Sequence, residues 1–349
     1  MTTEAVRPDG LASGAGRAPL LSTGGTLDEP LLAVDLDGRP EPEVAAAAVV
    51  AAAQAERILV GVATEPVDPV LDPLLAALDV TLVPAGADGS RATVGVADPA
   101  GELAGLRAAV AANPQAATVL ATLLRWSVDL PVAAALDAES LAYSTLLGGP
   151  EFARWLAGRG PRPLPPPAGR DPVAVDRVGG ALRITLDRPE RRNAYGRELR
   201  DALLAALDVA VLDDGIEQVV LDGAGPAFCS GGDLDEFGTT PDLVTAHFVR
   251  TRAGAARPLH RIAHRVEARL HGACVGAGIE LPAFAGRVVA APDAVFRLPE
   301  IAMGLVPGAG GTVSIPRRIG RWRFLYLALS GRGLDAATAL RWGLVDEIG

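Results

Sequence analysis

The sequence contains no lysine, and all 32 of its basic residues are therefore arginines. Without lysine the chain cannot form a Gly-Lys-Ser/Thr phosphate loop, a lysine Schiff base or a Ser–Lys catalytic dyad. Any phosphate group on a ligand must be bound by arginine, by backbone N–H groups or by the end of a helix. The absence of this one residue type thus excludes three classes of functional site.

Cysteines and long apolar runs are also scarce. The chain has two cysteines, Cys229 and Cys274, and its longest apolar run, residues 44–53, is mostly alanine. Two cysteines without a signal peptide predict no disulfide framework, and the run is too short to cross a bilayer. The net charge of −10 argues against nucleic acid or an anionic membrane as a general partner. We therefore predict a cytoplasmic protein that binds neither nucleic acid nor membrane.

Proline marks the expected boundary between domains. Residues 158–172 contain six prolines, which cannot donate backbone hydrogen bonds and favour an extended chain. We predict a linker at residues 161–172, which separates a domain at residues 29–160 from one at residues 173–349. Residues 1–28 are rich in Gly, Ala, Ser and Thr, and this composition predicts a disordered tail.

The C-terminal domain alternates between strand and helix patterns. Residues 181–187 alternate as a strand does, residues 193–207 carry leucines at helical spacing, and residues 218–222 and 267–272 indicate buried strands. Shorter strands are expected at residues 288–291 and 294–296. This alternation predicts an α/β fold.

The N-terminal domain repeats the start of that pattern. Residues 31–37 parallel residues 181–187, and residues 57–63 parallel residues 218–223. A duplicated domain and a chance likeness between α/β segments both explain this. We predict a degenerate copy, which ends in helices and lacks the glycine-rich motifs described next.

Two glycine-rich turns in the C-terminal domain predict a pair of backbone donors. They lie at residues 226–234 and 271–281. Adjacent glycines allow backbone angles that other residues avoid, so that the N–H groups of Gly232 and Ala277 can point into a pocket. Two such donors aimed at one carbonyl oxygen stabilise the negative charge that develops on it, each by about 3 kcal/mol. A plain Gly-Gly turn is the alternative for the first motif taken alone.

Two glutamates follow the second turn. Glu280 and Glu300 both have apolar neighbours, which predicts partial burial and a raised pKa. A charge at a helix N-terminus would also explain Glu280. Two carboxyl groups beside a pair of N–H donors favour proton transfer next to an enolate.

These motifs resemble those of the crotonase (enoyl-CoA hydratase/isomerase) superfamily. The likeness covers about half of the chain, from residue 173 to residue 349, and includes both turns. It extends to the segments at residues 186–194, 298–312, 329–332 and 342–346. The resemblance implies a ββα spiral core in the C-terminal domain and an acyl-CoA thioester as substrate. It also implies a homo-oligomer, a trimer or a hexamer.

The resemblance further assigns roles to residues. It implies that the N–H groups of Gly232 and Ala277 form an oxyanion hole, and that Glu280 and Glu300 are the two acids of the hydratase branch. One acid activates water for attack at Cβ, and the other protonates Cα. The residues implied in CoA binding are Arg191, Arg192, Asn193, Ala194, Gly231, Asp233 and Leu234. No metal and no separate cofactor are expected, because coenzyme A is part of the substrate.

Members of the superfamily usually continue beyond the point that matches residue 349, into helices that cover the acyl pocket and build a trimer. In this sequence residues 113–118, 136–143 and 149–159 resemble those helices. We therefore expect the crotonase-like N-terminal domain to end in lid helices over the active C-terminal core.

The predicted activity is hydration of a 2-enoyl-CoA or dehydration of a 3-hydroxyacyl-CoA. A double-bond isomerase that uses Glu300 alone, another reaction through an enolate, and a non-catalytic acyl-CoA-binding subunit are the alternatives. His260 and His264 have metal-ligand spacing, but histidines in an arginine-rich segment are more often a solvated helix face. Both glutamates favour an enzyme, since an unused buried carboxylate costs stability.

Overall fold

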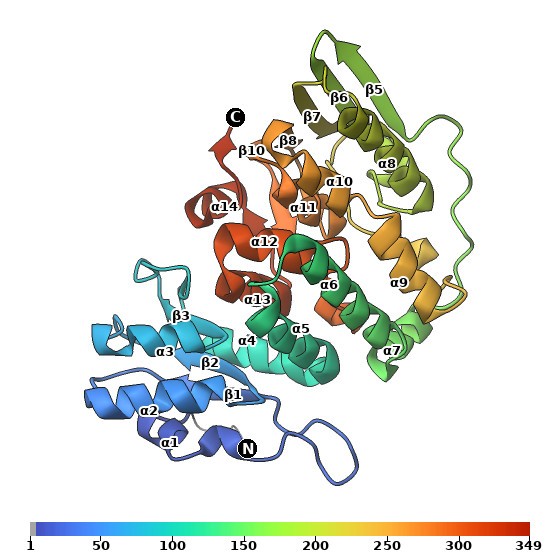
Figure 1. Cartoon of the computed structure of the whole chain (residues 1–349). Coiled ribbons are helices and arrows are strands. Elements are labelled where there is room, and N and C mark those ends of the chain that lie inside the picture. Colours follow the sequence, from blue (N-terminus) through green and yellow to red (C-terminus); the bar gives the residue numbers. More distant parts are fainter. Residues whose placement is uncertain (1–4) are drawn as a thin grey trace. The chain divides into compact units, whose positions relative to one another are not determined.

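The computed structural model describes residues 5–349, and the chain forms two compact units (Figure 1). Unit 1 comprises the chain up to Trp126 together with Ile319–Ser330, and unit 2 comprises Ser127–Arg318 and Gly331–Gly349. Both units are α/β, as the alternating pattern predicted. No helix among residues 5–349 is long and apolar enough to cross a membrane.

Unit 1 is built on a parallel sheet of four strands in sequence order. The strands are β1 (Leu31–Asp35), β2 (Ile58–Val62), β3 (Val80–Pro84) and β4 (Val94–Val96). The first three are buried along most of their length, which is typical of a parallel sheet covered on both faces. The helices of this unit are α1 (Pro8–Ala12), α2 (Pro42–Ala53), α3 (Asp72–Ala77), α4 (Pro99–Ala112), α5 (Pro114–Ser127, ending at the border with unit 2) and α13 (Arg321–Ser330).

The predicted disordered tail is wrong for residues 5–28, while residues 1–4 lie outside the described part of the chain. Leu11 of α1 is fully buried in a cluster that includes the alanines of α2. The guanidinium of Arg57 donates to the carbonyl oxygens of Ala18 and Pro19. The composition indicated disorder, but Leu11, the backbone pairing of Val6 with β1, and Arg57 tie the segment to the rest of unit 1.

The main sheet of unit 2 has the strand order β13-β10-β8-β7-β6-β5. Its strands are β5 (Val173–Val178), β6 (Ala181–Leu186), β7 (Gln218–Gly223), β8 (Val266–Leu270), β10 (Arg287–Ala290) and β13 (Glu347–Ile348). Only the β5–β6 hairpin is antiparallel. The strands expected at residues 181–187, 218–222, 267–272 and 288–291 are confirmed, with ends that differ by one or two residues.

A second, smaller sheet of unit 2 consists of β9 (Ala273–Val275), β11 (Val295–Arg297) and β12 (Leu334–Asp335). The helices of unit 2 are α6 (Val132–Leu147), α7 (Pro150–Arg159), α8 (Arg197–Leu212), α9 (Leu243–Arg252), α10 (Ala256–Arg261), α11 (Ala277–Glu280), α12 (Gly311–Ile319) and α14 (Ala336–Trp342). The helix expected from residue 193 begins four residues later, at Arg197. Asn193 has a left-handed φ of 54°, which a helix cannot contain.

The boundary between the two units does not fall at the proline-rich linker. Residues 161–172 contain no helix or strand, as expected. Yet α6 and α7 belong to unit 2, while α13, taken from the predicted C-terminal domain, belongs to unit 1. In unit 2, α6 packs along α9 (Figure 1), where the Ser144 hydroxyl donates to the Leu243 carbonyl oxygen at 3.1 Å. Packing rather than position in the sequence therefore decides where these helices belong.

Candidate active site

Two backbone N–H groups without protein acceptors lie on one cavity of unit 2. Gly232 and Ala277 both line this cavity, whose volume is about 560 Å³. Within residues 5–349, neither N–H donates a hydrogen bond to the protein. Because most N–H groups in protein interiors are hydrogen-bonded, such a pair is suited to receive an oxygen atom from a ligand.

The small sheet brings the two donors together. Cys229, in the first glycine-rich turn, runs beside β9 as an added strand segment: its N–H donates to the Ala273 oxygen at 3.2 Å, and its own oxygen accepts from Val275 at 3.0 Å. Gly232 lies three residues after Cys229, and Ala277 two residues after Val275. The ladder thus fixes the register between the turns.

Glycine is required at position 276, where φ is +50°. A Cβ atom built there would lie 2.6 Å from Glu300 Oε1 and 3.7 Å from Glu280 Oε1. Any side chain would therefore collide with a carboxyl group. The two acids predicted from the sequence converge on the turn that carries the Ala277 N–H.

Glu280 is the last residue of α11, which is a single helical turn. Its side chain is 2% exposed, and Oε2 accepts from the N–H groups of Ala309 and Gly311 at 2.7 and 2.9 Å. Burial raises the pKa of Glu280 to about 7, although the two N–H groups oppose the shift. Near neutral pH this carboxyl group can both accept and release a proton.

Glu300 begins the 3₁₀ turn Glu300–Met303, and its Oε2 atom is buried with no hydrogen-bond partner in the part of the chain that the structure describes. Burial, and then the neighbouring charges of Glu280 and Glu139, raise the pKa of Glu300 well above its usual value. A buried carboxyl group with an unpaired oxygen is expected to hold its proton at neutral pH.

A third buried glutamate, Glu139, enters from α6. Its side chain is 2% exposed. Oε1 accepts from Gly310 N–H at 2.8 Å, and Oε2 accepts from the N–H and hydroxyl of Thr312 at 2.9 and 2.8 Å. Burial and the charge of Glu280 raise the pKa of Glu139 to about 8. Three carboxyl groups therefore share one site.

One face of α6 forms a wall of the cavity. The residues that α6 contributes recur at helical spacing and are Leu136, Glu139, Ser140, Tyr143 and Leu147. Opposite Tyr143, the guanidinium of Arg250 from α9 stacks on the ring at 4.5 Å and donates to the Ser140 hydroxyl at 3.2 Å. The α6 face thus combines apolar and polar side chains, and Arg250 lies against it from α9.

Comparison with known proteins assigns this arrangement to a family. The model of the enoyl-CoA hydratase/isomerase family matches residues 176–349. A 1,2-epoxyphenylacetyl-CoA isomerase of Escherichia coli (strain K12) is 36% identical over 174 residues, which are 48% of this chain and 66% of that relative. A 2,3-dehydroadipyl-CoA hydratase of the same strain is 34% identical over 176 residues, which are 50% of this chain and 68% of that relative. The chain belongs to the enoyl-CoA hydratase/isomerase family.

A solved structure gives a similar match: the crystal structure of the enoyl-CoA hydratase from Thermoplasma volcanium GSS1 aligns with a TM-score of 0.48 and 34% identity over 52% of this chain and 72% of that one. The chain thus spans about two thirds of the length of the curated relatives that it matches. The family match confirms the resemblance inferred from the glycine-rich turns and the other matching segments.

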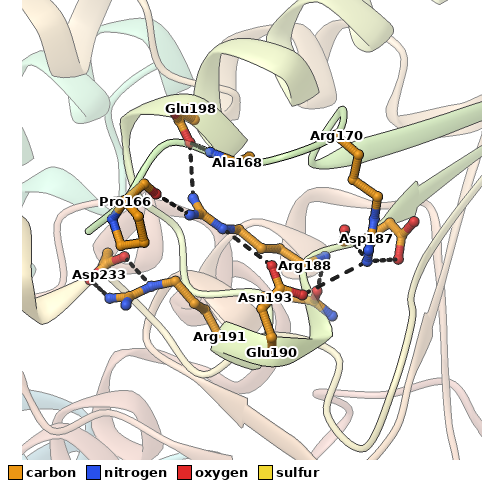
Figure 2. Close-up of polar contacts among 10 residues, drawn as sticks. All are labelled: Pro166, Ala168, Arg170, Asp187, Arg188, Glu190, Arg191, Asn193, Glu198 and Asp233. Carbon is orange, nitrogen blue, oxygen red and sulfur yellow. Dashed lines mark hydrogen bonds and ion pairs between the residues drawn. The ribbon is translucent and has the colours of Figure 1, made fainter.

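The residues predicted to bind CoA differ in burial and in whether their side chains are already paired. Arg191 forms an ion pair with Asp233 at 2.7 Å (Figure 2). It also pairs with Asp235 at 2.9 Å, so that its guanidinium is already engaged. Asn193 is completely buried. By contrast, the Arg192 side chain is exposed and makes no hydrogen bond or ion pair among the described residues.

Asn193 ties the loop before α8 to the first turn. Its amide nitrogen donates to the carbonyl oxygens of Ala224, Ala227 and Phe228 at 2.9 to 3.1 Å, and its amide oxygen accepts from Arg188 N–H at 2.8 Å. All the strong hydrogen-bonding groups of the side chain are therefore in use. Asn193 holds the backbone of the site, a role that motif spacing could not reveal.

Arg188 connects the proline-rich linker to the same loop (Figure 2). Its guanidinium donates to the Pro166 oxygen at 2.7 Å and pairs with Glu198 at 3.0 Å, while Glu198 accepts from Ala168 N–H at 2.9 Å. These contacts fix the linker against α8. Leu164, in the same linker, lines the cavity.

The cavity collects some predicted residues and not others. Gly232, Ala277, Glu280, Glu300 and Asp233 line it. The remaining predicted CoA contacts, Arg191, Arg192, Asn193, Ala194, Gly231 and Leu234, lie outside its lining.

Sequence reasoning overlooked the cavity residues Glu139, Tyr143 and Arg250. The likeness of residues 136–143 to lid helices was the signal that placed two of them near the core, but it gave neither a role. Arg250 gave no such signal, because it belongs to none of the motifs found in the sequence.

Proposed function

We propose that the protein is an enoyl-CoA hydratase, which adds water to a 2-enoyl-CoA or removes it from a 3-hydroxyacyl-CoA. The observation that carries the proposal is the convergence of two unpartnered N–H groups and two glutamates on one cavity. Each part alone has a structural explanation. Together they supply an oxyanion hole, a base and an acid, which are the needs of this reaction.

The N–H groups of Gly232 and Ala277 would hold the thioester oxygen. When water attacks Cβ, the double-bond electrons move toward the carbonyl and charge develops on this oxygen. Donors fixed beforehand stabilise that charge without reorganisation, by about 3 kcal/mol each. Neither donor has a competing acceptor within residues 5–349, so both are available.

The environments of the two glutamates support different roles. Glu280, with a pKa of about 7, is partly ionised near neutral pH and would take a proton from the attacking water. Glu300, whose pKa is raised well above its usual value by burial and by the charges of Glu280 and Glu139, would donate its proton to Cα. The water oxygen bonds to Cβ, Cα gains the Glu300 proton, and Glu280 holds the water proton. Return of that proton to Glu300 completes the cycle.

Exposed arginines beside the first turn and on the cavity lining would bind the CoA phosphates in place of lysine. Arg192 is exposed beside the first turn, and Arg197 is an exposed residue of the cavity lining. Neither side chain makes a hydrogen bond or ion pair within the described residues. Arg191 is less suited, because Asp233 and Asp235 neutralise it.

The test is turnover of crotonyl-CoA, followed by the loss of absorbance of the conjugated thioester. Glu280→Gln and Glu300→Gln should each lose most of the activity, while Glu347→Gln, an exposed glutamate outside the cavity lining, should keep it. Binding of the thioester should survive in all three variants.

Other outcomes would point elsewhere. A parent protein that binds thioesters but is inert on short, long and aromatic enoyl-CoAs would overturn the hydratase assignment. Activity on a 3-enoyl-CoA that needs Glu300 but survives Glu280→Gln would identify an isomerase instead.

A further inference from the structure

We infer that Glu139 of α6 is a positioning residue for Glu280, acting through the glycine loop, residues 308–312. The inference rests on the proposed function, because it concerns the glutamate proposed as the base. It goes further by making a helix from before the proline-rich linker part of the catalytic apparatus.

The glycine loop is bound by two carboxylates in alternation. The N–H groups of Ala309 and Gly311 donate to Glu280 Oε2, at 2.7 and 2.9 Å. The intervening Gly310 and the following Thr312 donate to the other glutamate, Glu139, at 2.8 and 2.9 Å. Four successive N–H groups therefore go alternately to the base and to α6. Any shift of the loop toward or away from α6 must change the hold on Glu280.

The residue types in the glycine loop fit this double contact. Gly310 has a φ of +106°, which side chains rarely permit. A Cβ on Gly311 would lie 2.6 Å from Glu280 Cγ, and a Cβ on Gly308 would lie 2.3 Å from the ring of Tyr143. The loop thus lies directly against both the base and α6. Substitution at these glycines would disturb both contacts.

Glu139 is also linked to the base by charge. The titratable and charged groups with which it interacts electrostatically are Glu280, Glu300, Tyr143 and Arg250. The like charge of Glu139 contributes to the raised pKa of Glu300. Glu139, with a pKa of about 8, carries this charge at basic pH, where replacing it with glutamine removes the charge and should lower the pKa of Glu300. The basic limb of the rate profile should then move to lower pH.

Glutamine cannot replace the carboxylate fully. Its amide has one acceptor oxygen where Glu139 uses two, so that a donor from Gly310 or Thr312 loses its partner in Glu139→Gln. We expect the glycine loop to move, kcat to fall about 10- to 100-fold, and KM for the thioester to change little. Asp137→Asn is the matched control, because Asp137 lies on α6, pairs with Arg257 and does not line the cavity.

A double-mutant cycle separates positioning from an independent role. If Glu139 acts through Glu280, Glu139→Gln should reduce kcat in the parent but have little further effect in Glu280→Gln. Thr312→Val, which removes only the hydroxyl bond to Glu139, should give a smaller loss of the same kind. Losses that multiply in the double variant, or full activity in Glu139→Gln alone, would overturn the inference.

Amide hydrogen exchange tests the loop even if the proposed reaction is wrong. In Glu139→Gln the peptide that covers residues 308–314 should lose protection from exchange, while the peptide that covers β7 should not. In Asp137→Asn neither of these two peptides should lose protection. An inert parent with this exchange pattern would reject the hydratase assignment and keep the positioning role. Unchanged protection in Glu139→Gln would reject the positioning role alone.

Discussion

Both units contain a sheet with similar strands. They differ in whether the turn that follows a strand is closed by hydrogen bonds from the protein itself. In unit 1, Asp37 follows β1 and its carboxylate accepts from Thr64 N–H, the Thr64 hydroxyl and Glu65 N–H, at 2.7, 2.6 and 3.4 Å. The turn after β2 is therefore closed by the protein itself. In unit 2 the corresponding aspartate, Asp187, pairs instead with Arg170.

The turn after β7 in unit 2 keeps a free donor. Gly232 N–H has no acceptor among residues 5–349, although its neighbours Gly231 and Asp233 are hydrogen-bonded to Tyr195. The same strand–helix–strand arrangement can thus end in a satisfied turn or in an exposed donor. The comparison teaches that a site in this fold depends on hydrogen bonds that the protein leaves unmade.

The largest expected effect on kcat comes from replacing Glu300, an acid that has no counterpart in the turn of unit 1. Glu300→Gln should lower kcat by about 10²- to 10⁴-fold, because glutamine cannot donate the proton to Cα. Glu65→Gln, in the turn of unit 1, should leave the rate unchanged. Steady-state kinetics on crotonyl-CoA measures both. Equal losses in the two variants would break the contrast between the units.

A side chain in the second glycine-rich turn of unit 2, residues 271–281, should have the next largest effect. Gly276→Ala introduces a methyl group 2.6 Å from Glu300 Oε1 at a φ of +50°. We expect kcat to fall about 100-fold, since a displacement of roughly 1 Å at reacting groups has this cost. Circular dichroism checks that the variant is folded. A folded variant with normal kcat would show that the turn tolerates movement.

The acids of unit 2 should also give the protein a distinctive dependence on pH. Glu280 and Glu139 have pKa values raised to about 7 and about 8, so the folded protein binds more protons than the unfolded chain above about pH 4.5. Stability from these groups is present below that pH and is lost as pH rises through 7 and 8, by at most about 1.4 kcal/mol per pH unit for each group.

Urea unfolding at pH 5, 6, 7 and 8 measures this trend, and Glu139→Gln should flatten it. The rate has the opposite trend on its acidic side: it should rise as pH increases through about 7, while Glu280 ionises, and fall when Glu300 loses its proton. A stability that grows between pH 5 and 8 would contradict the assignment of raised pKa values.

The smallest effect belongs to the closed turn of unit 1. Asp37→Ala removes three acceptor contacts from an exposed carboxylate and should reduce the free energy of unfolding by about 1 kcal/mol. kcat should not change, since this turn is outside the cavity lining. Urea unfolding and kinetics on the same sample test both statements, and a loss of kcat would tie the turn of unit 1 to the reaction.

Much of the scaffold follows from local patterns in the sequence. Alternation predicts β6 and β7, and Gly231 and Gly276 have the left-handed φ that favours glycine. The acids Glu280 and Glu300 were identified by their motif, and the structure places both on one cavity. These features are local, because strand pattern, left-handed φ and apolar neighbours are written in adjacent residues.

The remainder depended on contacts between distant segments. Leu11 packs against α2, and the Asn193 amide nitrogen donates to three carbonyl oxygens. Helix α6 brings Glu139 to a hydrogen bond of 2.8 Å with the N–H of Gly310, which lies 171 residues further along the chain. Sequence pattern shows that a helix has an apolar face, but not which surface will cover it. The sequence by itself determined the two turns and their acids. Only tertiary packing decided which helix lies against them, because the free energy of burying apolar surface does not depend on how far apart two segments are in the sequence.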